Sequence, residues 1–196
     1  MKTEYSGHNL LFSYMSKSDL FYVCSMLEKD SVCRWLFFGP NSHEATKKYF
    51  EPIIASIKSD LLEKRLPKTP VFTIKDKRSG FFVGQCALLP VEFCEGSYII
   101  GYQLDNICWR RGFGTEACRF LIYYAFYIAG GYRLNGDCIT ENPGSYKIME
   151  KCGFTRECVQ KKYWNHNGAF YDRVLYYLLR DEMDNEYISE LKAEFE

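Results

Sequence analysis

A strand, a glycine-containing loop and a helix follow one another directly after residue 98, and this order constrains the fold more than any other feature. Residues 98–104 are rich in β-branched and aromatic residues, as a strand would be. Residues 104–117 read LDNICWRRGFGTEA and pass into a helix with apolar positions at Ala117, Phe120, Leu121, Tyr124, Ala125 and Ile128. Gly130-Gly131 ends that helix, and residues 132–140 form the next expected strand. This unit predicts a parallel crossover.

The other segments predict strands, hairpins and helices around that crossover. Strand patterns bounded by turn residues occur at residues 10–12, 71–75, 81–89, 155–163 and 170–179. Helices are expected to begin at Ser18 or Asp19, at Ser42 and at Asn142-Pro143, and Gly153 ends the last of them. The chain is therefore expected to be a mixed α/β protein, with a mostly antiparallel sheet that contains one parallel pair and is flanked by helices.

The composition favours one folded domain. The 196 residues are 47% hydrophobic and 26% charged, which excludes a disordered chain. The sequence contains no internal repeat and no low-complexity segment. We expect residues 1–180 to form a single domain, because this length suits one core. Residues 181–196 are mainly acidic and polar, and we expect a solvated C-terminal helix there.

Charge and cysteine usage narrow the class of protein further. The formal net charge is zero, whereas a nucleic-acid binder usually carries a net positive field. The nine cysteines include no Cys-x-x-Cys pair, and the three histidines are scattered, so we expect reduced, mostly buried thiols and no metal centre. The N-terminus has no signal-peptide pattern, and the apolar stretch 120–132 is too short to span a bilayer. We expect a cytoplasmic protein without a nucleic-acid or membrane partner.

The loop before the central helix has the character of an anion site. The first turn of a helix leaves backbone N–H groups unpaired and carries partial positive charge. Glycines allow a phosphate oxygen to approach the backbone, and two arginines add local positive charge. These features predict a pyrophosphate cradle at Arg110-Arg111-Gly112-Phe113-Gly114-Thr115, although a tight turn would use the same glycines. The loop lacks both the Gly-Lys-Ser/Thr of a P-loop and the third glycine of a dinucleotide fingerprint.

Four short motifs in fixed order extend this pattern. They are Gly101-Tyr102-Gln103-Leu104, Trp109-Arg110-Arg111-Gly112-Phe113-Gly114-Thr115-Glu116-Ala117, Glu141-Asn142-Pro143-Gly144-Ser145 and Glu150-Lys151-Cys152-Gly153-Phe154. In order and spacing the chain resembles the GNAT N-acetyltransferase superfamily, and most closely its branch that includes the ribosomal-protein-alanine N-acetyltransferases. The resemblance covers residues from about 10 to 179. It implies a sheet whose central parallel strands splay apart.

The resemblance also implies a cofactor and a set of site residues. Acetyl-CoA is the expected donor, and amides around Arg110 to Thr115 are expected to bind its pyrophosphate. Free backbone groups near Leu104 are expected to pair with the pantetheine as an added strand would. Asn142 matches the asparagine that hydrogen-bonds near the pantetheine, and Ser145 matches a serine close to the CoA sulfur. Ser145 is the expected acid for the leaving thiolate; the alternative is that it serves only the start of its helix.

Two positions differ from the usual pattern and affect the proton transfers. Many members of the superfamily have a Glu just before the Gly-Tyr, where this chain has Ile99 and Ile100. Met149 occupies the position of the tyrosine that other branches use as the acid, which leaves Ser145, with Tyr146 as a weaker candidate. The base is open between a water chain and carboxylates such as Glu28 or Asp172, both of which also read as ordinary surface charges.

The acceptor remains open at the level of the sequence. The expected acceptor is a primary amine, either a protein N-terminus or a small molecule, attacked directly in a ternary complex. The aromatic segment with Trp35, Phe37 and Phe38 reads either as ordinary core or as one border of the acceptor pocket. The alternative function, which the missing Glu favours, is a CoA-binding module without catalysis. A homodimer is compatible with either function.

Overall fold

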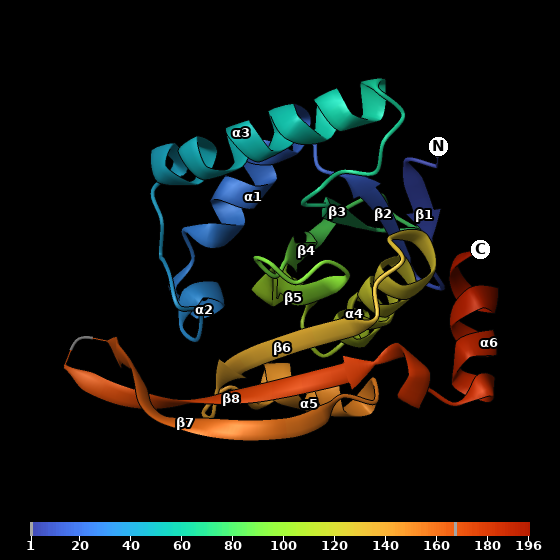
Figure 1. The fold of residues 1–196 in the computed structure, drawn as a ribbon. Helices are drawn as coiled ribbons and strands as arrows, with labels where there is room; N and C mark the ends of the chain where they lie inside the picture. The colour runs from blue at the N-terminus through green and yellow to red at the C-terminus, as the bar shows by residue number, and fades with distance from the viewer. Residues whose placement is uncertain (1, 167) are drawn as a thin grey trace.

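The computed structural model describes residues 2–166 and 168–196, and its centre is one eight-stranded sheet (Figure 1). The strands are β1 (Glu4–Ser6), β2 (Leu10–Tyr14), β3 (Val71–Asp76), β4 (Phe82–Pro90), β5 (Ser97–Leu104), β6 (Arg133–Ile139), β7 (Thr155–His166) and β8 (Ala169–Leu179). They lie in the order β1-β2-β3-β4-β5-β6-β8-β7. β5 and β6 run parallel, and the other neighbouring strands run antiparallel. This confirms the predicted mixed fold.

Helices cover both faces of the sheet. They are α1 (Leu20–Leu27), α2 (Asp30–Cys33), α3 (His43–Leu62), α4 (Phe113–Tyr123), α5 (Pro143–Lys151) and α6 (Asn185–Phe195). α1 and α3 pack together on one face, whereas α4 lies on the other face between α5 and α6 (Figure 1). No helix in residues 2–166 or 168–196 has both the length and the apolarity that a bilayer crossing needs.

The crossover between β5 and β6 forms as predicted, with one added turn. Gly112 caps α4, which therefore begins at Phe113, two residues before the expected start. After Tyr123 the helix continues as a π-helical turn from Tyr124 to Ile128. The N–H of Gly131 then donates to the carbonyl of Ala125 at 2.7 Å and closes the helix. The crossover thus delivers the chain from β5 to its parallel neighbour β6.

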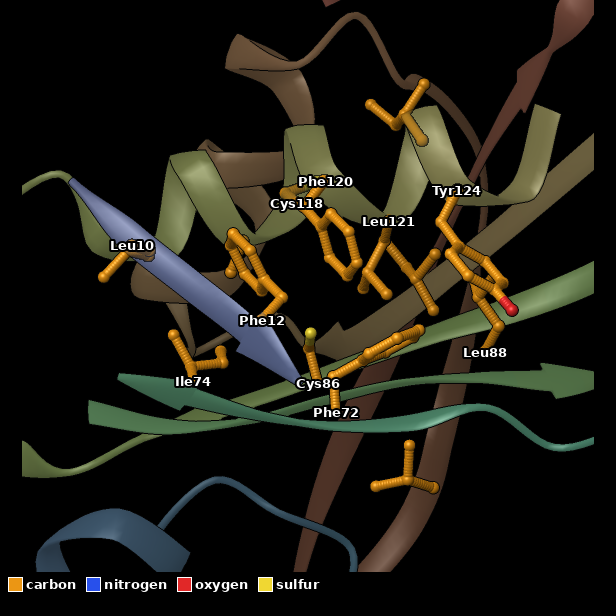
Figure 2. Close-up of a cluster of buried hydrophobic side chains, with 14 of the residues drawn as sticks. Leu10, Phe12, Phe72, Ile74, Cys86, Leu88, Cys118, Phe120, Leu121 and Tyr124 are labelled. Atoms are coloured by element: carbon orange, nitrogen blue, oxygen red, sulfur yellow. The ribbon is translucent and has the colours of Figure 1, made fainter. Parts of the chain in front are cut away.

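Aromatic packing fixes α4 against the sheet (Figure 2). The ring of Phe120 stacks on that of Phe12 in β2, with 4.0 Å between the ring centres. Phe72 of β3 meets Phe120 edge-on, and the hydroxyl of Tyr124 lies 2.6 Å from that of Tyr14. All of these side chains are buried. Since α4 is anchored along its whole inner face, its first turn is held at a fixed position relative to β5.

Several local predictions need correction. β1 and α2 were not expected, and Ser16 rather than Ser18 begins the turn before α1. The tail is helical over α6, but the expectation of a solvated helix is wrong. Leu191 and Phe195 are fully buried against the domain, and Arg119 of α4 pairs with Glu194 at 2.8 Å.

The cysteines and the last hairpin follow the predictions. All nine cysteines are free thiols, and all except Cys94 and Cys158 are buried. The hairpin of β7 and β8 forms as expected; Asn167 in its predicted turn lies outside the described residues. Among the residues described, no three His, Cys, Asp or Glu side chains converge as a metal site would require.

Candidate active site

The loop between β5 and α4 presents a run of unpaired backbone donors. Among the described residues, no hydrogen bond has its donor at the backbone N–H of any residue from Arg110 to Thr115. The first paired N–H in the helix is that of Glu116, which donates to the carbonyl of Gly112 at 3.2 Å. Six consecutive N–H groups and the positive end of the α4 dipole are therefore available to one anion.

Gly112 and Gly114 serve different purposes in this loop. Gly112 has φ +81, and a Cβ atom there would meet no other atom within 4 Å, so its surroundings are open. Gly114 is buried, and a Cβ there would lie 2.6 Å from Cδ1 of Ile148 in α5. From the sequence, both glycines were expected to let a phosphate oxygen approach the backbone. At Gly114 the missing side chain instead lets α4 approach α5.

Some side chains of the loop already have partners among the described residues, and one does not. Arg111 lies 3.3 Å from the carboxylate of Asp76, and its guanidinium covers the ring of Phe113. Phe113 is itself buried, so it offers only its backbone N–H to a ligand. Within the described chain, Arg110 is exposed and makes no ion pair or ring contact. Arg110 is thus the cation that remains available beside the free N–H groups.

β5 and β6 separate next to this loop. They pair over three residue pairs, the last between Ile99 and Asn135. Beyond that point β5 stays paired with β4 up to Leu104, and β6 stays paired with β8 up to Ile139. Asp105 N–H donates to the carbonyl of Val83, which fixes the register, so Ile100, Tyr102 and Leu104 direct their main-chain groups away from β4. The open edge of β5 therefore lines a gap between the two parallel strands.

The first turn of α5 borders the gap from the other side. The Oδ1 atom of Asn142 accepts a hydrogen bond from the N–H of Ser145 at 3.2 Å, which makes Asn142 the N-cap of α5. The hydroxyl of Tyr102 in β5 donates to the carbonyl of Ser145 at 3.2 Å. Burial holds the pKa of Tyr102 far above its usual range, so this phenol stays a neutral donor. The contact joins β5 to α5 where the strands part.

The side chain of Ser145 has a neighbour that the sequence did not reveal. The thiol of Cys138 in β6 lies near its hydroxyl, and that thiol donates a hydrogen bond to the carbonyl of Asn142 at 3.9 Å. Burial raises the pKa of the Cys138 thiol to about 11, although the contact with Ser145 acts in the opposite direction. The thiol is therefore neutral near pH 7, and it lies near the Ser145 hydroxyl at the β6 side of the gap.

The other positions weighed for proton transfer have these surroundings in the structure. Met149 is buried, and Tyr146 packs against the core. Glu28 lies 2.9 Å from Nε2 of His43. Asp172 pairs with Lys161 at 2.8 Å, and chiefly for that reason its pKa is lowered. Both carboxylates thus already have partners.

Three residues near the site escaped the sequence interpretation. The indole N–H of Trp109 donates to the carbonyl of Leu104 at 2.9 Å and ties the loop to the end of β5. Glu116 is buried and accepts from the N–H groups of Asn9 and Leu10, so it anchors α4 to the start of β2. Asp137 lies in β6 two positions beyond Asn135, beside the gap. In the sequence, Glu116 is an acidic residue next to the apolar positions of its helix, and this could have indicated that it is buried and structural.

The aromatic segment after α2 is not ordinary core. Trp35 is half-buried, whereas Phe37 and Phe38 are exposed. The ring of Phe37 lies 6.0 Å from that of Tyr163 in β7, between ring centres. The core reading of this segment is therefore wrong, and the segment faces the β7–β8 hairpin.

Two hollows lie outside the loop and its free N–H groups. One has a volume of about 590 Å³ and is lined by Gly7, His8, Lys77, Arg119, Glu190, Ala193 and Glu194. The other measures about 360 Å³ and lies around the start of β6, with Ile99, Asn135, Asp137 and Arg173 in its wall. Neither of these two hollows is lined by Arg110 to Thr115.

Comparison with known proteins identifies the fold and the family. A family model described as "Acetyltransferase (GNAT) domain" matches residues 9–155. "Uncharacterized N-acetyltransferase YoaA" of Bacillus subtilis (strain 168) is 32% identical over 81 residues, which are 41% of this chain and 46% of that protein. The first curated relatives are matched over 46%, 62% and 61% of their own length, so the chain spans about half of them.

Solved structures extend the likeness across nearly the whole chain. A structure of RimL, a ribosomal L7/L12 alpha-N-protein acetyltransferase in complex with coenzyme A, has a TM-score of 0.76 at 18% identity and covers 91% of this chain and 98% of its own. Spermidine N-acetyltransferase from Vibrio cholerae, in complex with CoA and spermine, has a TM-score of 0.75 at 16% identity and covers 92% and 98%. With its splayed parallel pair and the family match over residues 9–155, the chain belongs to the GNAT acetyltransferase family.

Proposed function

We propose that the protein is an N-acetyltransferase that transfers the acetyl group of acetyl-CoA to a primary amine by direct attack in a ternary complex. The observation that carries this proposal is the run of six unpaired N–H groups from Arg110 to Thr115, placed beside the gap between β5 and β6. The family match and the CoA complexes among the similar structures support it.

The residues present fit acetyl-CoA. The backbone N–H groups of Arg110, Arg111, Gly112, Phe113, Gly114 and Thr115 would hold the pyrophosphate, because they have no protein acceptor and the space at Gly112 is open. The main-chain groups of Tyr102 and the N–H of Leu104 on the open edge of β5 would pair with the pantetheine amides, since the Leu104 carbonyl already accepts from the Trp109 indole. On the other side, the Asn142 side-chain N–H₂ is left over from its cap and would donate to the same chain.

The protein's own groups then serve the transfer. Acetyl-CoA supplies an acetyl thioester whose carbonyl carbon a neutral amine can attack. A main-chain N–H on the open edge of β5 would stabilise negative charge on the carbonyl oxygen, because it is fixed in the strand and unpaired. Ser145 would give its hydroxyl proton to the leaving sulfur, and water would return a proton to the Ser145 oxygen. The amine's proton would leave through water, since β5 carries Ile99 and Ile100 in place of a carboxylate.

A second candidate function is a CoA-binding module without catalysis, which the absence of a carboxylate at Ile99 and Ile100 favours. Two measurements separate the candidates: calorimetric titration with acetyl-CoA, and release of free CoA in the presence of a panel of amines. Amine-dependent CoA release would support the transferase. Tight acetyl-CoA binding with no amine-dependent release would contradict it and support the binding module.

A further inference from the structure

Aromatic side chains from two distant segments form one surface on the acceptor side. We call this surface the aromatic wall; it consists of Trp35, Phe37, Tyr163, Trp164 and Tyr171. The ring centres of Phe37 and Trp164 are 5.7 Å apart, and those of Trp35 and Tyr171 are 6.1 Å apart. Phe37 and Tyr163 remain 38% and 52% exposed despite these contacts. Clustered, exposed aromatic rings on a folded domain indicate a binding surface.

An arginine connects the aromatic wall to the gap between β5 and β6. The guanidinium of Arg173 in β8 lies 4.6 Å from the ring centre of Tyr163 and 5.9 Å from that of Phe37. Its Nε donates to the carboxylate of Asp137 at 2.7 Å. The last residue of β6 that pairs with β5 is Asn135, and Asp137 lies two positions after it. The aromatic wall therefore begins where the strands part.

The wall lies on the face of the sheet opposite α5. Gly136 and Cys138 in β6 face α5, because Gly136 abuts Met149 and the Cys138 thiol donates to the carbonyl of Asn142, the N-cap of α5. Successive strand residues alternate between faces, so Asp137 points the other way. In Figure 1, α2 and the segment after it lie above the carboxyl end of β6 and the β7–β8 hairpin. A thioester held along β5 is therefore reached from the side of the wall.

Three carboxylates near the gap have cationic partners. Asp105 lies 2.7 Å from the ammonium of Lys29, and Asp137 lies 2.7 Å from Arg173. Glu157 of β7 lies 2.9 Å from the guanidinium of Arg133. A polyamine carries several ammonium groups and needs unpaired carboxylates to replace their hydration. Beside the gap, the face offers aromatic rings and these three ion-paired carboxylates.

We infer that the acceptor is a primary monoamine carried on an aromatic or other apolar body, which packs on Phe37 and Tyr163, and that polyamines are poor acceptors. This inference rests on the proposed function and adds the substrate class to it. The apolar body would bury the exposed rings, while the single amine would extend past Arg173 and Asp137 to the gap. The similarity to a spermidine acetyltransferase at 16% identity shows the shared fold and leaves the acceptor open.

The test uses the whole chain, acetyl-CoA and two probe amines, 2-phenylethylamine and spermidine, with CoA release as the readout. We expect kcat/KM to be at least about tenfold higher for 2-phenylethylamine. Phe37→Ala and Tyr163→Ala should each raise its KM about tenfold and leave the KM for acetyl-CoA unchanged. Tyr49→Ala is the matched control, because Tyr49 is 59% exposed on α3. That variant should leave all of these constants unchanged.

The possible failures are distinguishable. A higher kcat/KM for spermidine, or wall variants that behave like Tyr49→Ala, would overturn the inference and leave the proposed function in place. If neither these nor other amines release CoA while acetyl-CoA still binds, the proposed function fails, and the inference fails with it. A wild-type dimer that Phe37→Ala converts to a monomer in sedimentation would make the wall an interface between copies, and would also overturn the inference.

Discussion

The donor side and the acceptor side of the gap are built in opposite ways. In the proposed function, the donor side would use mainly main-chain groups from one continuous stretch of chain, β5 to α5, between Ser97 and Lys151. The acceptor side would use side chains that meet only in the folded protein, such as Phe37 and Tyr163. A main-chain site is determined by local structure, which a short motif can specify. A side-chain site depends on how distant segments pack, which a short motif does not describe.

The largest expected effect tests whether the donor side depends on the backbone and its open surroundings at Gly112. Gly112→Asp should weaken acetyl-CoA binding about a hundredfold, because it places a negative charge against the pyrophosphate. Calorimetric titration measures the dissociation constant. Gly112→Asn is the matched variant, since Asn has nearly the same shape and tolerates the positive φ of +81 without a charge.

Two further observations sharpen that experiment. Gly112→Asn should retain most of the affinity, so that the difference between the two variants measures the charge alone. Gly130→Asp should bind acetyl-CoA like the wild type, because Gly130 also has a positive φ of +69 and open surroundings but lies at the far end of the helix. If Gly112→Asp binds acetyl-CoA as tightly as the wild type, the loop from Arg110 to Thr115 does not bind the pyrophosphate.

The second-largest effect tests whether Glu116, the acidic residue of the glycine-loop motif, stabilises the fold or binds acetyl-CoA. Glu116→Gln should lower the free energy of unfolding by about 2 kcal/mol, because the buried carboxylate accepts three hydrogen bonds from Asn9 and Leu10. Urea unfolding measures the change, and acetyl-CoA affinity should stay close to that of the wild type. Glu190→Gln is the control, since that exposed partner of Arg119 should contribute little. A stable Glu116→Gln protein that loses acetyl-CoA would contradict the structural role.

The third effect concerns the only side-chain chemistry assigned to the donor side. Ser145→Ala should lower kcat about tenfold while acetyl-CoA affinity is unchanged, because the hydroxyl that protonates the leaving sulfur is lost. The cap of α5 survives, since Asn142 accepts from the backbone N–H of Ser145. Steady-state CoA release measures kcat. An unchanged kcat would take Ser145 out of the mechanism.

The smallest effect separates the two glycines. Gly114→Ala should change the free energy of unfolding by less than about 1 kcal/mol, because the end of the flexible Ile148 side chain can move aside. Its acetyl-CoA affinity should match that of the wild type in the same titration. A loss comparable to that of Gly112→Asp would show that both glycines face the ligand, as the sequence alone suggested.

The sequence predicted the parts of the fold that local patterns encode. The crossover from β5 through α4 to β6, the cap at Asn142 and the two hairpins follow from periodicity and capping residues, and the structure confirms them. The amides of Arg110 to Thr115 could be named because a glycine loop and a helix start lie next to each other in the chain. Their role toward acetyl-CoA stays a prediction until binding is measured.

What the sequence did not reveal depends on long-range packing. The tail looked solvated because it is acidic, but Leu191 and Phe195 are spaced to share one face of α6, and that face packs on the domain. The contact between Ser145 and Cys138 requires β6 and α5 to meet. The pairing of Asp137 with Arg173 requires β6 to lie beside β8. None of these contacts has a signature within one short segment.

The central claim is that backbone N–H groups of one loop hold the pyrophosphate, and an amide NMR titration tests it most directly. With CoA, the amides of Arg110 to Thr115 should show the largest shifts. With pantetheine, which lacks the pyrophosphate, those amides should stay in place while amides on the open edge of β5, such as those of Tyr102 and Leu104, still shift. Shifts that instead gather around Gly7, Lys77 and Arg119, or a loop that does not respond to CoA, would contradict the account.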